Sequence, residues 1–383
     1  MSVAVSSGRP ARSPAAGAAR LMLGVLPAVP TVCAFAATLL LFSLFLLVQG
    51  QPAADALGLI VQGAYGSVFA WQNTLQRAAP LMLTALCVAL PAQVGLIVIG
   101  GEGALALGGL AAAVVPQLVP ATTPWFVAAP LMAVFGMIAG GVWVGAAGVL
   151  RQLRGVNETI SSLLLSYIAI ALFKHLVEGP LRDPATLNKP STPPLPDSMM
   201  IGSLPGLDVH WGLFWGLLAC IAAWVFVRHS TQGFAMRVAG GNPRAARLVG
   251  LPVNRLAILA CVLGGAAAGL AGMFEVAAVQ GSANASMLVG YGYAGILVAF
   301  AARQNPLAIV VCAVLVGGIE ASGSLLQRRL GLPDATTLVL QGLLFANLLA
   351  WEAFGVRLAA WRTRLQAAAH AGESVAQLED KHA

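Results

Sequence analysis

Long apolar runs separated by short polar segments dominate the chain between residues 28 and 354. About 20 apolar residues suffice for one helical membrane crossing. This criterion predicts an all-α integral membrane protein with about ten transmembrane helices. They are expected at residues 28–48, 79–99, 102–119, 125–149, 158–177, 211–228, 257–279, 289–302, 307–326 and 335–354. Segment 50–76 is too interrupted for a clean span, and we place it on the outer side as an amphipathic stretch, with a re-entrant piece as the alternative.

Composition agrees with a membrane protein. Apolar residues make up 58% of the chain and charged residues 9%, against about 45–50% and about 25% in soluble domains. The 43 glycines favour closely packed helices. The net charge of +7 reflects arginine-rich cytoplasmic edges, so no nucleic acid partner is expected. All five cysteines stand singly in apolar runs, which indicates neither a disulfide framework nor a metal site.

The distribution of basic residues sets the predicted orientation. With the N-terminus inside, the cytoplasmic segments together with Arg228, at the cytoplasmic end of the expected span 211–228, hold 15 of the 21 Lys and Arg residues, as the positive-inside rule requires. Both termini are then cytoplasmic, residues 1–27 and 355–383 are tails, and 28–354 is the transmembrane domain. The pair Arg328 and Arg329 falls on the outer side, and its role stays open.

Two loops stand out. The outer loop 178–210 carries seven prolines and is expected to be extended, exposed and available to a partner on that face. The cytoplasmic loop 229–256 lies in a stretch, 228–255, with five arginines and no acid. In it, Asn242 suits an N-cap, Pro243 a first helical position, and Gly250 a helix end. We predict a two-turn docking helix; the alternative is an ordinary loop that is basic because it is cytoplasmic.

Motifs for chemistry on this chain are missing. The sequence has no GxxxxGK[ST], HExxH or GxSxG string, so phosphate-cradling, metalloprotease and acyl-transfer sites are not predicted. We expect no catalytic residue, no metal ligand and no cofactor. An intramembrane enzyme is the least favoured alternative.

Carboxylates inside apolar runs are costly and point to function. Glu102 lies between two glycines at a predicted helix break, and a second break falls at residues 288–300, in a half of opposite orientation. Paired breaks in inverted halves indicate a translocation path. The candidate path residues are Gly101, Glu102, Gly103, Asn157, Glu275, Tyr291, Tyr293 and Glu320. The alternatives are that the glycines serve only close helix packing and that Asn157 is only a helix cap.

Several strings resemble the membrane permeases of bacterial ATP-binding-cassette (ABC) importers. The resemblance is to the ribose and branched-chain amino acid permease superfamily, and within it to the nucleoside and simple-sugar type. It covers roughly residues 78–350. The matching strings are GLIVIGGEGALALGG, NETISSLLLSYIA, EGPLRDP, GGNPRAARLVGLPVNR, GGAAAGLAGMFEV and GYGYAGILVAFAARQNPLA.

The resemblance implies a multi-pass subunit of the bacterial plasma (inner) membrane that works by alternating access. Its partners would be two cytoplasmic ATPase subunits, which hold ATP and Mg, a second permease and an extracytoplasmic solute-binding protein. The coupling residues would be Asn242, Pro243, Arg244, Ala245, Ala246, Arg247 and Gly250. Arg244 replaces the Glu of many importers, and Glu102 lacks the Asn-Ile-Gly-Ala prefix common in the family.

The solute is expected to be a nucleoside, a purine-like base or a simple sugar, and the sequence does not decide among them. It also leaves open whether the two permeases are identical. A secondary transporter driven by an ion gradient is the alternative, with Glu102, Glu275 and Glu320 as coupling carboxylates.

Overall fold

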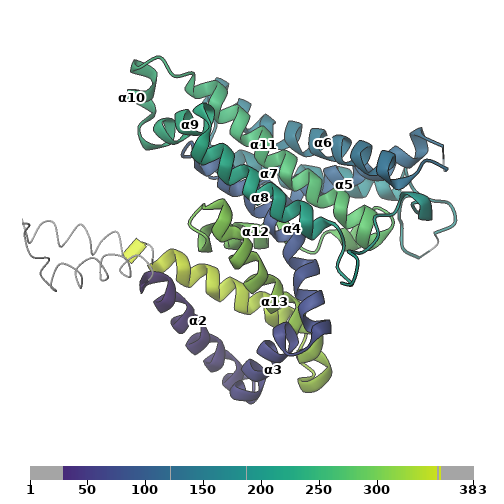
Figure 1. Cartoon of the computed structure of the whole chain (residues 1–383). Coiled ribbons are helices and arrows are strands. Elements are labelled where there is room, and N and C mark those ends of the chain that lie inside the picture. The colour runs from purple at the N-terminus through teal and green to yellow at the C-terminus, as the bar shows by residue number, and fades with distance from the viewer. Residues whose placement is uncertain (1–28, 121, 187, 352, 355–383) are drawn as a thin grey trace, which may run out of the picture. The chain divides into compact units, whose positions relative to one another are not determined.

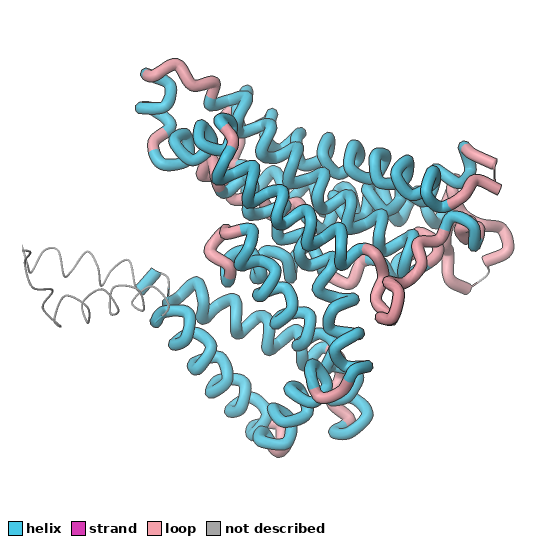
Figure 2. Tube along the Cα trace, in the orientation of Figure 1, coloured by secondary structure: helices cyan, strands magenta, loops and turns pink. Residues whose placement is uncertain are grey.

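The structure is a computed structural model that describes residues 29–354, except residues 121, 187 and 352. The tails expected at 1–27 and 355–383 lie outside the described residues. Within the described range the chain is helical, and the β-type pairing there is limited to two isolated bridges (Figure 2). The chain divides into two compact parts: residues 49–341, and the flanking segments up to Val48 and from Gly342.

The larger part, residues 49–341, consists of helices, and its longest connection is the 178–210 loop (Figure 1). Their bounds are α3 (Ala53–Tyr65), α4 (Val68–Ala92), α5 (Gly101–Leu118), α6 (Trp125–Arg154), α7 (Glu158–Glu178), α8 (Gly212–His229), α9 (Thr231–Gly241), α10 (Pro243–Leu248), α11 (Val253–Phe274), α12 (Tyr291–Ala301) and α13 (Pro306–Leu330). A π-helical turn, Glu275–Gln280, continues α11. Short 3₁₀ turns lie at Asp197–Met199 and Ala285–Met287.

Seven helices of the described chain are long and apolar enough to cross a membrane: α4, α5, α6, α7, α8, α11 with its π-helical turn, and α13. Three shorter apolar helices coincide with the remaining expected spans: Cys33–Val48, Ala285–Ala301 and Ala335–Trp351. The chain is therefore a multi-pass, all-helical membrane protein, as its composition predicts. The number of ten spans and the cytoplasmic position of both termini stay predictions.

Glycines let α5, α6 and α11 approach one another closely. A Cβ atom on Gly108 of α5 would overlap the backbone of Gly269 in α11. One on Gly140 of α6 would overlap the backbone of Gly265, also in α11. These crossings confirm that glycines serve close helix packing. Because these positions carry no side chain, the backbone of α11 packs directly against the backbones of α5 and α6.

The structure corrects the limits of one expected span, 79–99. α4 begins earlier, at Val68, because the Ser67 hydroxyl accepts a hydrogen bond from the N–H of Ala70 at 3.1 Å. It also ends earlier, at Ala92, and residues 96–100 have no regular secondary structure. Residues 68–76, predicted to belong to the outer stretch 50–76, are thus the first turns of α4. Residues 96–99 are as apolar as the residues of a membrane-spanning helix, so hydrophobicity alone could not show that the helix ends before them.

The proline-rich loop 178–210 is extended, but it is not fully exposed as predicted. It lies along residues 277–284, where the N–H of Thr192 donates to the carbonyl of Ala283 at 3.0 Å. The N–H of Ile201 donates to the carbonyl of Ala277 at 2.9 Å. Its buried members include Thr192, Met199, Val209 and His210. Proline fixes the extended backbone, while these contacts, invisible in the sequence, bury one edge.

The smaller part contains α2 (Val29–Val48) and the chain from Gly342 onward. The side-chain amide of Asn347 donates to the Thr38 hydroxyl at 3.2 Å and to the carbonyl of Leu343 at 2.9 Å. The contact between Asn347 and Thr38 joins the two segments.

Candidate functional site

The first helix break, residues 96–100, is fixed by hydroxyl groups on one face of α7. These are Thr159, Ser162 and Ser166, spaced three and four residues apart. Ser162 accepts the N–H of Ile99 at 2.9 Å, and Ser166 accepts the N–H of Gly103 at 2.9 Å. Thr159 donates to the carbonyl of Ile97 at 2.9 Å. The unwound backbone therefore has partners, as a break inside a membrane requires.

The second break, residues 281–290, ends at α12. Gly290, with φ of 98°, is the N-cap, and this left-handed conformation favours glycine. The Glu102 carboxylate accepts the N–H of Gly290 at 3.0 Å and the N–H of Gly292 at 2.6 Å. A carboxylate at a helix N-terminus is stabilised by the helix dipole. The two broken helices, α5 and α12, thus meet at their N-terminal ends.

Glu102 is only 2% exposed, and each of its oxygens has a backbone partner. A Cβ atom on Gly292 would overlap the backbone of Glu102, so the two helix ends touch. The first turn of α5, with Gly101 and Gly103, is buried as well. In this arrangement Glu102 joins two helices.

A charged group lies beside this junction. Arg77 of α4 is 4.0 Å from a carboxylate oxygen of Glu320 of α13, and Gln341 donates to the other oxygen of Glu320 at 3.3 Å. Glu275, buried in the π-helical turn, interacts electrostatically with Arg77, Glu320 and Glu102. The structure therefore pairs Glu320 with Arg77, and Glu275 and Glu102 influence this pair through their charge alone. It adds Arg77, which the sequence analysis counted only as an outer-side charge.

The two predicted tyrosines have different surroundings. Tyr291 is buried, and its backbone carbonyl accepts the Thr84 hydroxyl at 3.0 Å. Tyr293 keeps part of its ring exposed and interacts with the side chain of Ser166. Of the two rings, Tyr293 is the one with accessible surface for a solute.

Asn157 lies in the turn between α6 and α7. Its side-chain oxygen accepts the N–H groups of Thr159 at 2.9 Å and of Ile160 at 3.1 Å, so it caps α7. The next residue, Glu158, pairs with Arg151 at 3.2 Å. Among the described residues, no hydrogen bond or ion pair links Asn157 directly to the charged group around Arg77.

The basic loop contains the predicted short helix, α10. The Asn242 side chain accepts the N–H groups of Arg244 and Ala245, each at 3.1 Å, Pro243 opens the helix, and Gly250 follows it with φ of 82°. Ala246 is fully buried. Leu248 and Val249 are 88% and 73% exposed. Two large apolar side chains at a tip, next to the exposed Arg244 and Arg247, form a surface suited to another protein.

The sequence analysis missed α9, which precedes α10. Its first turn is capped by Ser230, whose hydroxyl accepts the N–H of Gly233 at 2.9 Å. Its buried residues Met236 and Ala239 share a core with Ala246 and with Ala257 of α11. The Ser230–Thr231 start was a readable N-cap signal. The basic residues around it favoured the interpretation as a loop.

Comparisons with known proteins identify the family of the chain. A family model described as "Branched-chain amino acid transport system / permease component" matches residues 70–349. A glucose ABC transporter permease protein of Haloferax volcanii is 33% identical over 311 residues, which cover 78% of this chain and 81% of that protein. A guanosine ABC transporter permease protein of Bacillus subtilis is 29% identical, covering 76% and 84%. A nucleoside ABC transporter permease protein of Lactococcus lactis is 27% identical, covering 67% and 73%.

Proposed function

The chain belongs to the permease-component family of branched-chain amino acid transport systems, and on that premise we propose that it forms the translocation path of a bacterial ABC importer. As a member of this family it is a transport component and not an enzyme. The observation that carries the proposal is α10, a capped helix with a buried Ala246 and an exposed apolar tip. A carrier driven by an ion gradient has no need of such a docking surface.

The proposed solute is small, polar and uncharged: a nucleoside, a purine-like base or a simple sugar. The relatives that support this choice are named for glucose, guanosine and nucleosides. Each of these solutes carries hydroxyl groups, a planar ring, or both. The partly exposed ring of Tyr293 offers a stacking surface for either kind.

The proposed path runs past the junction of the two broken helices. It includes the predicted residues Gly101, Glu102, Gly103, Asn157, Glu275, Tyr291, Tyr293 and Glu320, to which we add Arg77. Within it, Glu102 holds α5 to α12, and Tyr293 faces the solute. Glu275, Glu320 and Arg77 form a polar wall in which Arg77 offsets part of the carboxylate charge.

Force from the partner ATPases would reach this junction through α11. This helix begins five residues after α10 and leads into Glu275. Its 22 residues span about 33 Å. Glycine contacts with α5 and α6 leave few side chains to obstruct a shift of α11. A push on α10 would therefore move Glu275 and the N-terminal end of α12, and alternating access would follow.

The proposed assembly places the chain in the inner membrane with α10 and both termini on the cytoplasmic side. Two ATPase subunits, which hold ATP and Mg, would bind at α10, and a second permease would complete the path. A solute-binding protein would deliver solute to the face that carries the 178–210 loop. One edge of that loop is exposed and the other is anchored on residues 277–284.

Reconstitution into vesicles tests the proposal. We expect uptake of uridine or D-glucose only when the second permease, the solute-binding protein, the ATPases and ATP are supplied. Omitting ATP, at an unchanged proton or sodium gradient, is the control. Uptake by this chain alone under a gradient would contradict the proposal and favour the carrier, with Glu102, Glu275 and Glu320 as coupling groups.

A further inference from the structure

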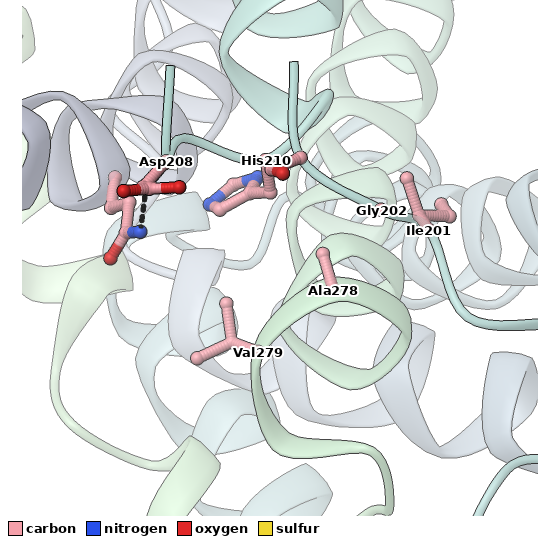
Figure 3. Close-up of a pocket in the computed structure, with 8 residues that line it drawn as sticks. Ile201, Gly202, Asp208, His210, Ala278 and Val279 are labelled. Carbon is pink, nitrogen blue, oxygen red and sulfur yellow. Dashed lines mark hydrogen bonds between the residues drawn. The ribbon is translucent and has the colours of Figure 1, made fainter. Parts of the chain in front are cut away.

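A polar cavity lies outside the helix junction, between the 178–210 loop and two helices. Its volume is about 450 Å³, within the range of small-molecule sites. It is lined by Gln76, Ile201, Gly202, Ser203, Asp208, His210, Ala278 and Val279. Figure 3 shows the His210 ring between Asp208 and the helical turn that carries Ala278 and Val279.

His210 is held in one orientation by its own backbone. Ser203 and His210 pair as an isolated bridge, and the N–H of Gly212 donates to His210 Nδ1 at 3.1 Å. A Cβ atom on Gly212 would collide with the imidazole ring, so glycine permits this contact. The ring therefore has little freedom to turn away from the cavity.

This contact also fixes the proton on the ring. Burial lowers the pKa of His210, and the nearby backbone carbonyl of Gln76 offsets that shift only in part. The ring is thus neutral, and because Nδ1 accepts a hydrogen bond, the proton is on Nε2. His210 is 6% exposed, and Nε2 has no partner of good hydrogen-bond geometry among the described residues, although the Gln76 carbonyl lies near the ring. A buried donor without a partner costs about 1–3 kcal/mol, so a partner is expected.

The other lining groups indicate the kind of ligand. The side-chain amide of Gln76 donates to the carbonyl of Asp208 at 2.6 Å, which fixes the amide and leaves its oxygen as an acceptor. The Asp208 carboxylate is exposed and can accept two hydroxyl groups. Ile201, Ala278 and Val279 supply an apolar floor. The lining contains no arginine or lysine, which disfavours an anionic solute.

We infer that this cavity is an outer holding site for a neutral, hydroxyl-bearing ring compound, with His210 Nε2–H donating to a ligand oxygen and Asp208 accepting from ligand hydroxyls. A metal ion is a poor alternative, because it would need the lone pair where Nε2 carries hydrogen. The inference rests on the proposed function for its ligand class. The cavity adjoins the path: Gln76 precedes Arg77, and Ala278 lies one turn after Glu275.

Histidine-selective NMR on the ¹⁵N-labelled full chain in lipid nanodiscs tests the inference. Without ligand, His210 should show the Nε2–H tautomer. Titration with uridine and with D-glucose should shift the His210 Nε2 signal saturably for at least one of them. His229, exposed at the other end of α8, is the internal control and should not shift.

Two substitutions then separate the donor from the fold. His210→Asn keeps an acceptor for the Gly212 N–H but removes the donor at the ε position, and we expect the Kd to rise about tenfold. His210→Gln restores an N–H donor at that position and should keep the Kd within about threefold of wild type. Equal Kd values for the wild type and both variants would overturn the inference.

The inference and the proposed function fail in different ways. A His210 signal unmoved by both probes, in a chain that supports ATP-dependent uptake, overturns the holding site and leaves the proposed function intact. A shifted His210 signal in a chain that never supports such uptake preserves the site and removes the proposed function.

Discussion

The Glu102 carboxylate accepts the backbone N–H of Gly292 at 2.6 Å, so the first turn of α5 caps the first turn of α12. The second oxygen accepts the N–H of Gly290 at 3.0 Å. Two helices from distant parts of the sequence are thereby joined end to end at the break of each. A change at this contact should affect both breaks at once.

Glu102→Gln should lower stability and uptake together. The amide side chain keeps one acceptor and turns an N–H₂ group toward a backbone N–H, which leaves one buried donor without a partner. The cost is about 1–3 kcal/mol, measurable as a lower Tm in detergent. Glu178→Gln, at the exposed end of α7, is the control and should leave Tm unchanged. An unaltered Tm in Glu102→Gln would contradict the role of the Glu102 carboxylate in joining α5 to α12.

Gly292→Ala should have a similar effect for a steric reason. Its Cβ atom would overlap the backbone of Glu102, and the two helix ends would have to separate. Overpacking of this kind typically costs about 1–3 kcal/mol. Gly202→Ala is the matched control, because a Cβ atom there meets open space. Equal Tm values for the two variants would show that α5 and α12 do not touch.

Ser162→Ala and Ser166→Ala should each destabilise the first break. Each removes the acceptor for one backbone N–H, of Ile99 or Gly103, at a cost of about 1–3 kcal/mol. Ser161→Ala is the control on the same helix, because the Ser161 hydroxyl bonds only the Glu158 carbonyl of its own helix. We expect faster backbone hydrogen exchange across 96–103 in the first two variants. Unchanged exchange there would contradict the role given to α7.

Protonation of His210 should lower the stability of the fold as the pH falls. Burial lowers its pKa below the usual value of about 6.5, so the unfolded chain takes up this proton at a higher pH than the folded one. The contribution is complete above about pH 6.5 and is lost as the pH falls toward the folded pKa. Protonation also takes from Gly212 its acceptor, Nδ1. Between about pH 7 and pH 5, the wild type should lose more Tm than His210→Gln; an equal loss would contradict the neutral ring.

Several features were predictable from the sequence because local signals specify them. Asn242, Pro243 and Gly250 delimit α10 through capping and backbone preference, and the structure has this helix at Pro243–Leu248. The glycines around Glu102 and those within 288–300 predicted the two helix breaks, and the structure begins α5 at Gly101 and α12 at Tyr291. The membrane class followed from apolar content alone.

Other features depend on distant contacts and were not predictable. The non-helical residues 96–99 are apolar, and their backbone is held away from a helix by the hydroxyls of α7. Arg77 gained its place in the charged group through Glu320, which is 243 residues away in the sequence. The 178–210 loop was expected to be exposed because prolines predict extended backbone, but they do not specify what covers it.

Leu248 offers the most direct test of the central claim, that partner ATPases drive this chain through α10. A photoreactive p-benzoylphenylalanine at position 248 replaces a side chain that is 88% exposed, so the fold should tolerate it. In the assembled importer we expect it to crosslink to the ATPase subunit, while the same group at Leu207, in the 178–210 loop, should not. Crosslinking to the ATPase from position 207 and not from 248 would contradict the claim.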